Sequence, residues 1–399
     1  MNGAQSLLTT LVNSGVEVCF TNPGTSEMHF VAALDEVEGI RCVLCLFEGV
    51  LSGAAAGYAV MAGKPASTLL HLGPGLGNAL ANVHNARKGN LPMINIVGDH
   101  ATYHLQYDAP LTSDIEGIAG PVSHWVRTSA AADEIAVDAA AAVAAAGIGQ
   151  VATLILPADV SWGENTVGIE NAVQPAAPSP VAPALIDEAY ARLTSGRHCM
   201  LMIGGRHVGL EHSLLLSRIG QATGAKVVTE TFPARQTRGA GSGVVERLPY
   251  LAELAIDYLK DVEELILIGA PSPVSFFAYP NLPGAMAPEH CRELALAGPD
   301  DDIDQLLADL SARFGDSAVE PVVQPLAVPE APSGALDVTT AGAALAHCLP
   351  ADAIVVDESI TSGMACFPMT ANAHSHDWLN LTGGAIGWGL PAAVGAAIA

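Results

Sequence analysis

The stretch CVLCLFEGVLSGAAAGYA, residues 42–59, places one acidic side chain between two apolar segments of different character. Residues 42–47 form a short apolar run of the kind found in buried β-strands. The residues after Glu48 are mostly small and are typical of a helix. Glu48 is therefore expected to open a helix directly after a strand, which is the repeating unit of parallel α/β sheets.

The same alternation of apolar runs and helix-like stretches continues through the first 157 residues. Such alternation indicates a parallel sheet that is covered by helices. The predicted strands of this region are VEVCFT (16–21), CVLCLF (42–47), STLLHL (67–72), MINIVG (93–98) and ATLILP (152–157).

Two Pro-rich connectors, at 171–183 and 319–334, divide the rest of the chain. Between them, the predicted strands are HCMLMIGGR (198–206), AKVVTE (225–230) and ELILIGAP (264–271), and AIVVDES (353–359) follows the second connector. We predict an α/β fold of three doubly wound parallel-sheet domains, of which the third is incomplete. Their predicted bounds are 1–170, 184–318 and 335–399.

Composition narrows the class of protein. A chain of 399 residues is too long for one hydrophobic core and fits two or three domains. It carries 41 acidic and 16 basic residues, a net charge of −25, which argues against nucleic acids and anionic membrane surfaces as partners. The N-terminus lacks the basic start and apolar core of a signal peptide, and no segment is predicted to span a membrane. We therefore expect a cytoplasmic protein.

Two glycine turns follow predicted strands, TNPGTSE at 21–27 and HLGPGLGN at 71–78. In α/β folds ligands bind at such turns, because the crevice lies outside the carboxyl ends of the strands. Pro-Gly turns also occur as simple connections. Both interpretations are open for either turn taken alone.

Glu48 is expected at the same edge of the sheet as these turns. It could be an acid in the first turn of a helix, stabilised by the helix dipole. It could instead be a partly desolvated carboxyl that shares a proton with a ligand nitrogen. His71, at the end of the next strand, is placed to act as an acid or base beside it, although strand-end histidines are often structural. Ser26 is a candidate nucleophile, but GTSE does not match a nucleophile elbow.

Taken in order along the chain, these features resemble the thiamine-diphosphate enzymes of the acetolactate synthase and benzoylformate decarboxylase group. The motifs that carry the resemblance are NPGTSE, LFEGVLSGAAAGYA, the GPG-x-x-N turn at 73–78, VVDES at 355–359 and GGAIGWGLPAAVG at 383–395. The resemblance spans the whole chain. It implies pyrimidine-binding, middle and diphosphate-binding domains.

The resemblance assigns roles to individual residues. Glu48 matches the glutamate that hydrogen-bonds a pyrimidine nitrogen of the cofactor and so helps it lose its thiazolium proton. Gly384 matches the residue whose carbonyl accepts from the aminopyrimidine, and Ile386 matches the apolar residue beneath the cofactor. The remaining residues implied to bind the cofactor are Pro23, Gly24, Asn78, Glu358, Ser359 and Thr361.

Some positions depart from the synthase pattern. His71 stands where the synthases usually have a threonine-serine pair and benzoylformate decarboxylase has a histidine. With Ser26, it would handle protons of the substrate. The synthase flavin-contacting segments have no clear match in the middle domain, so FAD is not predicted. The residues that bind Mg²⁺ at the diphosphate are expected beyond Ala399, in a longer gene product.

The implied reaction is decarboxylation of a small-molecule 2-oxo acid with carboligation to a second 2-oxo acid, using thiamine diphosphate and Mg²⁺. One alternative is a 2-oxo acid decarboxylase without ligation, and another is a catalytically silent paralogue or fragment. Because the family builds each site from the first domain of one subunit and the third domain of another, a homodimer or homotetramer is also implied.

Overall fold

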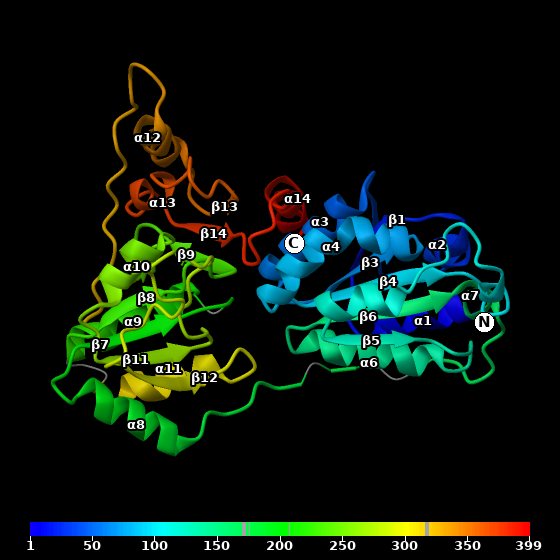
Figure 1. Cartoon of the computed structure of the whole chain (residues 1–399), viewed down its shortest axis with the longest axis horizontal. Helices are drawn as coiled ribbons and strands as arrows, with labels where there is room; N and C mark the ends of the chain where they lie inside the picture. The colour runs from blue at the N-terminus through cyan, green and yellow to red at the C-terminus, as the bar shows by residue number, and fades with distance from the viewer. Residues whose placement is uncertain (170–172, 175, 207, 316–318) are drawn as a thin grey trace. The chain divides into compact units, whose positions relative to one another are not determined.

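The chain forms two compact units in the computed structural model, which describes residues 1–169, 173–174, 176–206, 208–315 and 319–399 (Figure 1). One unit contains Met1–Ala177 together with Leu381–Ala399, and the other contains Pro178–Asn380. The predicted ends of the first two domains, residues 170 and 318, lie outside the described residues. The three predicted domain bounds stay predictions.

The first unit is built on a six-stranded sheet in the order β2-β1-β3-β4-β6-β5. All neighbouring strands are parallel, as predicted. Each predicted run in this region overlaps one of these strands, whereas β5 was not predicted because it is short and half-exposed. The strands are β1 Val18–Asn22, β2 Arg41–Leu44, β3 Ala66–Leu70, β4 Met93–Asp99, β5 Trp125–Thr128 and β6 Val151–Pro157.

Helices cover both faces of this sheet (Figure 1). α1 and α6 share one apolar core with β1, β3, β4 and β6, while α3 and α4 pack together on the strands from the other side. The helices of this unit are α1 Gly3–Asn13, α2 Met28–Glu36, α3 Glu48–Ala62, α4 Leu72–Lys88, α5 Ile115–Ala119, α6 Ile135–Gly147, α7 Ala158–Trp162 and α14 Gly389–Ile398.

The small residues of α3 let a second helix approach it closely. α14 packs directly on α3. A methyl group on Gly57 would overlap the backbone of Ala392, and one on Gly395 would overlap the carbonyl of Ala54. Most of α3 is buried as a result. The small-residue run that marked this segment as a helix is therefore a helix-packing surface.

The second unit contains a five-stranded parallel sheet in the order β10-β8-β7-β11-β12. Its first strand, β7, lies in the middle, as in doubly wound folds. The strands are β7 Cys199–Ile203, β8 Lys226–Thr229, β10 Glu246–Arg247, β11 Glu264–Ile268 and β12 Arg292–Ala297. The helices of this sheet are α8 Pro183–Leu193, α9 Leu210–Thr223, α10 Ala252–Leu259 and α11 Ile303–Ala312.

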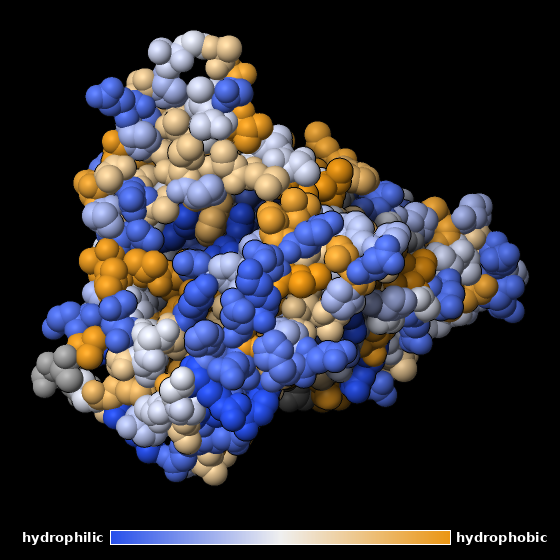
Figure 2. Space-filling model, turned by 60° about the vertical axis from the view of Figure 1, so that its left-hand side comes forward, coloured by the Kyte–Doolittle hydropathy of each residue, from blue (hydrophilic) through white to orange (hydrophobic). Residues whose placement is uncertain are grey.

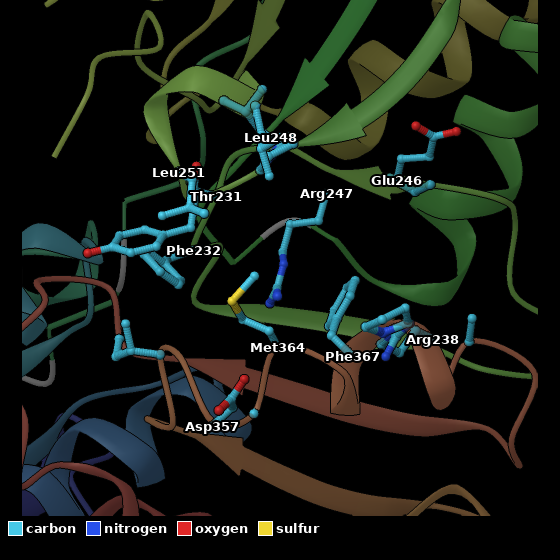
Figure 3. A pocket seen from close by; sticks show the side chains of 18 of the residues that line it. Thr231, Phe232, Arg238, Glu246, Arg247, Leu248, Leu251, Asp357, Met364 and Phe367 are labelled. Atoms are coloured by element: carbon cyan, nitrogen blue, oxygen red, sulfur yellow. The ribbon is translucent and has the colours of Figure 1, made fainter. Parts of the chain in front are cut away.

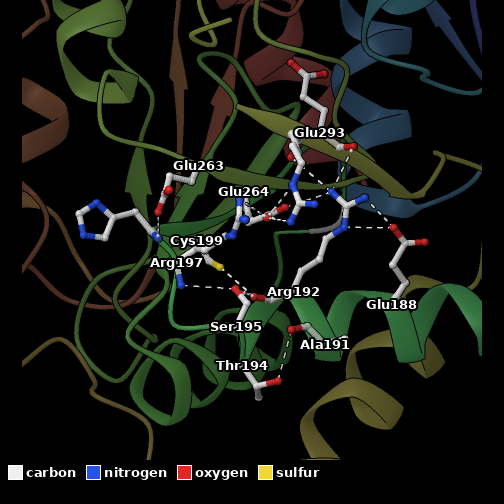
Figure 4. A network of polar contacts seen from close by, with 12 residues as sticks. Glu188, Ala191, Arg192, Thr194, Ser195, Arg197, Cys199, Glu263, Glu264 and Glu293 are labelled. Atoms are coloured by element: carbon white, nitrogen blue, oxygen red, sulfur yellow. Dashed lines mark hydrogen bonds and ion pairs between the residues drawn. The ribbon is translucent and has the colours of Figure 1, made fainter. Parts of the chain in front are cut away.

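A buried carboxylate anchors the start of β11 (Figure 4). The side chain of Glu264 has no exposed surface, and its oxygens pair with Arg192 at 3.2 Å, Arg197 at 3.7 Å and Arg292. A buried carboxylate is costly unless it is paired and hydrogen-bonded. These three arginines meet that requirement and tie α8, β11 and β12 together.

The segment after the second connector joins the second unit through a small mixed sheet. β13 (Ala353–Asp357) pairs in parallel with β14 (His376–Asn380), and β14 pairs antiparallel with β9 (Arg235–Arg238). α12 (Val338–Cys348) and α13 (Cys366–Met369) accompany it. β9 and β14 were not predicted, because RQTR and HDWLN lack an apolar strand pattern.

None of the helices in the described part of the chain combines the length and the apolar character needed to cross a membrane. Apolar side chains are nevertheless exposed in several groups on the surface (Figure 2). The most exposed of them include Leu44, Leu46, Leu336, Ile386 and Leu390.

Candidate active site

The carboxyl edge of the first sheet brings three predicted site segments together. Asn22 at the end of β1 pairs with Leu70 at the end of β3, so the turn at 23–24 and His71 leave the sheet side by side. Thr21 pairs with Leu44 at the end of β2, after which the chain continues to Glu48. Parallel strands place their carboxyl ends at one edge, and this edge is where doubly wound folds bind ligands.

His71 is held by a buried acid, Glu27. Its Nδ1 lies 2.8 Å from Glu27 Oε2, and the Glu27 side chain has no exposed surface. Burial raises the pKa of Glu27, while hydrogen bonds from the Gly24 amide at 2.7 Å and from His71 oppose this shift. Because Nδ1 faces Glu27, Nε2 is the ring nitrogen left to exchange a proton with a ligand.

The Glu27–His71 pair requires glycine at two positions. A Cβ on Gly24 would overlap the His71 ring, and a Cβ on Gly98 would overlap Glu27 Oε1. Among the described residues, Glu27 Oε1 has no hydrogen-bond partner. A buried polar atom without a partner is unusual in folded proteins and points to a functional site.

Glu48 is the first residue of α3, as the sequence predicted. Its Oε2 accepts a hydrogen bond of 3.0 Å from Asn78 Nδ2 on α4. A Cβ on Gly75 would lie 3.4 Å from Glu48 Oε1 and 3.5 Å from the His71 Cβ. Glu48 and His71 therefore flank the same glycine, and the structure brings Glu48, His71 and Asn78 together.

The surroundings of Glu48 are partly open to solvent. Glu48 is only half-buried, and its apolar neighbours face outward: Leu46 is 92% exposed and Phe47 is 49% exposed. Both side chains lie in the link between β2 and α3, and Phe47 is the residue directly before the helix.

The loop that carries Gly384 and Ile386 docks on α4. Asn85 both donates to the Ala385 carbonyl at 2.8 Å and accepts from the Ala385 amide at 3.1 Å. Asn82 donates to the carbonyl of Gly49 at 2.7 Å, directly after Glu48. The loop thus lies on the helix that carries Asn78, with Gly384 at a positive φ of 78° and Ile386 72% exposed.

Ser26 and Pro23 are half-buried in the turn after β1. The Gly24 amide is occupied, because it donates to Glu27. This turn therefore presents side chains rather than a free backbone amide at position 24.

Glu358, Ser359 and Thr361 belong to the second unit, where they follow β13. The Ser359 amide donates to Asp357 Oδ1 at 2.9 Å, and the Ser359 hydroxyl donates to the same oxygen. Asp357 therefore shapes this turn. Ser359 and Thr361 are exposed.

Sequence reasoning missed Glu27, although it lies in the quoted motif TNPGTSE. The sequence does place an acid, Glu27, shortly after one predicted strand and a histidine, His71, at the end of another. Their contact spans 44 residues of sequence, so only the pairing of β1 with β3 makes it visible.

Comparison with known proteins gives concordant results. Residues 1–119 match the family model described as the thiamine pyrophosphate enzyme, N-terminal TPP binding domain. The chain is 52% identical over 400 residues to a Mycobacterium tuberculosis protein named "Putative acetolactate synthase large subunit IlvX", covering all of this chain and 77% of that protein.

More distant relatives include decarboxylases. The chain is 28% identical over 417 residues to benzoylformate decarboxylase of Pseudomonas aeruginosa, covering 96% of this chain and 76% of that enzyme. The thiamine diphosphate-dependent 4-hydroxybenzoylformate decarboxylase of Rhodococcus jostii RHA1 has a similar fold, with a TM-score of 0.82 and 22% identity, over all of this chain and 79% of that one.

Proposed function

Because this chain belongs to the family of thiamine-diphosphate-dependent enzymes, we propose that it decarboxylates one 2-oxo acid and joins the remaining acyl unit to a second. The C1–C2 bond of the donor breaks and carbon dioxide leaves. A new carbon–carbon bond forms at the carbonyl carbon of the acceptor, and the acceptor oxygen takes up a proton. The observation that carries this proposal is the position of Glu48 and His71 on the two sides of Gly75.

The residues at this edge fit the cofactor. Glu48 is a half-buried carboxylate whose Oε2 is held by Asn78. The 383–387 loop docks on the same helix as Asn78. Glu48, Asn78, Gly384 and Ile386 would hold the pyrimidine end. Glu358, Ser359 and Thr361, which belong to the second unit, would contact the diphosphate. When bound, thiamine diphosphate supplies the electron sink for decarboxylation.

The side chains of the chain itself would control proton movement. Glu48 hydrogen-bonds a cofactor nitrogen and exchanges a proton with it, while Asn78 fixes the orientation of the carboxylate. His71 offers Nε2 to the substrate, because Nδ1 is held by Glu27. Ser26, in the neighbouring turn, would contact the substrate carboxylate.

Decarboxylation without ligation is a second candidate, and a specific observation favours it. Glu27 holds His71 in one orientation through a buried contact. A histidine fixed in this way is suited to protonating the product of decarboxylation before an acceptor can enter. The product would then be an aldehyde.

Product analysis separates these candidates. The purified protein is incubated with thiamine diphosphate, Mg²⁺ and either pyruvate, 2-oxobutyrate or benzoylformate. A 2-hydroxy-3-oxo acid, such as acetolactate from pyruvate, supports ligation, and an aldehyde alone supports simple decarboxylation. Release of no carbon dioxide from any of the three, with no cofactor binding by calorimetry, would support a silent paralogue.

We also propose that the chain works as a homodimer or homotetramer. Apolar side chains cluster on two packed helices of the first unit and on the segment before them. They include Leu44, Leu46, Phe47, Ile386, Leu390 and Val394. Exposed apolar groups of this kind mark interaction surfaces. A partner subunit would also exclude water from Glu48, which the chain leaves half-buried.

A further inference from the structure

A cavity of about 480 Å³ lies inside the second unit, between the segment that follows β8, strand β10 and the segment that contains α13. This volume is within the range of small-molecule pockets, roughly 300–1,000 Å³. The predicted catalytic residues of the first unit do not line it. The cavity therefore needs an explanation of its own.

Two arginines give the cavity its charge. The Arg238 guanidinium lies 3.6 Å from the centre of the Phe367 ring, and that of Arg247 lies 3.8 Å from it. Their hydrogen bonds go to neutral groups, Thr370 Oγ1 at 2.6 Å and Asn380 Oδ1 at 3.2 Å. Among the described residues, neither guanidinium forms an ion pair with a carboxylate.

Holding two cations in this position is unfavourable without an anion. Burial, together with the charge of Arg247, lowers the pKa of Arg238 to about 9. Burial also lowers the pKa of Arg247 to about 10, against the opposing effect of Asp357. Both shifts mean that the charged forms lack sufficient solvation or counter-charge, which a bound anion would supply.

The cavity also has an apolar end. Phe232 contacts Tyr250 with ring centres 5.6 Å apart, and Leu248 and Leu251 complete this wall. Figure 3 shows Phe232 and Leu251 on one side of Arg247, with Phe367 and Arg238 on the other. A ligand that fits would therefore have an anionic head and an apolar body.

The charges in the wall favour one negative charge on the ligand. Asp357 and Glu246 both line the cavity. The Glu246 carboxylate points away from Arg247 (Figure 3) and accepts from the Tyr258 hydroxyl. Because the Glu246 carboxylate is directed elsewhere, the two guanidinium charges against Asp357 leave a single positive charge beside the arginines. A monocarboxylate neutralises it, while a diphosphate would bring excess negative charge beside Asp357.

From these contacts, we propose that the cavity of Arg238 and Arg247 binds a small monocarboxylate with an apolar or aromatic body. The carboxylate contacts Arg247, and the body packs on Phe232, Leu248 and Leu251. The wall includes Asp357 and Met364, from the turn that also carries Ser359 and Thr361. Occupancy of the cavity is therefore expected to hold this turn in place. The inference does not depend on the proposed reaction.

Calorimetric titration of the full chain without thiamine diphosphate tests this proposal. Phenylacetate in low-salt buffer is expected to bind saturably, while phenylacetamide, its neutral counterpart, does not. Arg247→Met should weaken phenylacetate binding at least about tenfold, because it removes a charge-assisted contact, and Arg247→Lys should weaken it less. Arg313→Met is the matched control, since Arg313 pairs with Asp187 at the surface, and it should change nothing.

A second variant keeps the test decisive if Arg247→Met does not fold. Met364 is 48% exposed at the cavity wall, so Met364→Glu should fold and should weaken phenylacetate binding by adding a negative charge. Equal binding of the amide, or unchanged binding in both variants, would overturn the proposal. Tighter binding of inorganic phosphate than of phenylacetate would also overturn it. The same holds if thiamine diphosphate with Mg²⁺ displaces phenylacetate from the parent protein and Arg247→Met abolishes thiamine diphosphate binding.

Discussion

At the scale of single residues, the site consists of two pairs, each an ionisable side chain held by a neighbour. Glu48 is held by Asn78 and His71 by Glu27, and the two pairs lie on either side of Gly75. Because Asn78 binds Glu48 Oε2 and Glu27 binds His71 Nδ1, Glu48 Oε1 and His71 Nε2 are the atoms that remain for a ligand. This arrangement leads to two predictions on activity.

Replacing Glu48 with glutamine should nearly abolish cofactor activation. In Glu48→Gln the side-chain amide can still hydrogen-bond but cannot exchange a proton, so exchange of the thiazolium proton, followed by NMR in deuterated water, should slow at least about 100-fold. Glu38→Gln is the control, because Glu38 is an exposed acid of the same unit. An unchanged exchange rate would remove Glu48 from this role.

Replacing Glu27 tests whether it positions His71. Glu27→Gln removes the carboxylate that accepts from Nδ1, so turnover of the 2-oxo acid should fall about tenfold or more. The His71 ring should also lose its single tautomer in ¹⁵N NMR spectra. In a His71→Phe background, Glu27→Gln should have no further effect on turnover. If Glu27→Gln lowers turnover but leaves the His71 spectrum unchanged, Glu27 acts in another way.

At the scale of elements, close packing and the ends of strands determine stability. α3 and α14 approach through glycines. The second sheet carries a half-buried acid directly after β8, Glu230, whose Oε1 accepts from the Gly205 amide at 2.5 Å. Each feature can be tested by one substitution with a matched control.

Gly57→Ala should destabilise the first unit. The added methyl group overlaps the backbone of Ala392, and such overpacking costs about 1–3 kcal/mol of unfolding free energy. On α4, Gly77 has nothing within 4 Å of its Cβ position, so Gly77→Ala should stabilise by about 0.5–1 kcal/mol. Chemical denaturation measures both. Equal effects of the two substitutions would contradict the packing of α3 on α14.

Glu230 should make stability depend on pH. Burial raises its pKa to about 7 from the ordinary 4.5, although the bond from Gly205 lowers it. The folded protein therefore binds this proton more tightly than the unfolded chain, and stability is lost as the pH rises from 4.5 to about 7. Glu230→Gln should abolish this loss, which amounts to about 3 kcal/mol of unfolding free energy at most.

Melting temperatures at several values of pH provide the measurement. The variant should gain stability relative to the parent protein as the pH rises through this window and keep a constant difference above it. Glu253→Gln, which replaces an exposed acid of the same unit, should show no such trend. Parallel curves for Glu230→Gln and the parent would contradict the prediction.

At the scale of the whole molecule, the proposed assembly depends on exposed apolar side chains of the first unit. Leu46 is 92% and Leu390 is 84% exposed. Leu390→Lys should shift the protein toward monomers in analytical ultracentrifugation, because a charge would be buried at the interface. Leu336→Lys is the control, since Leu336 is 82% exposed in the second unit. A monomeric parent protein would contradict the assembly.

The sequence by itself determined the parallel α/β fold, since buried parallel strands are continuous apolar runs and each predicted run overlaps a strand. It also placed Glu48 at the start of a helix and His71 at the end of a strand. Strands β9 and β14 escaped prediction because their residues are polar and their pairing joins segments about 140 residues apart.

Only the tertiary structure decided which of these residues meet. Strand pairing brings Glu27 to His71, and helix packing brings Asn78 to Glu48 and α14 to α3. The cavity of Arg238 and Arg247 likewise depends on the mixed sheet of β9, β13 and β14. Local patterns encode elements because neighbouring residues share one backbone geometry, whereas contacts between elements depend on how their surfaces fit.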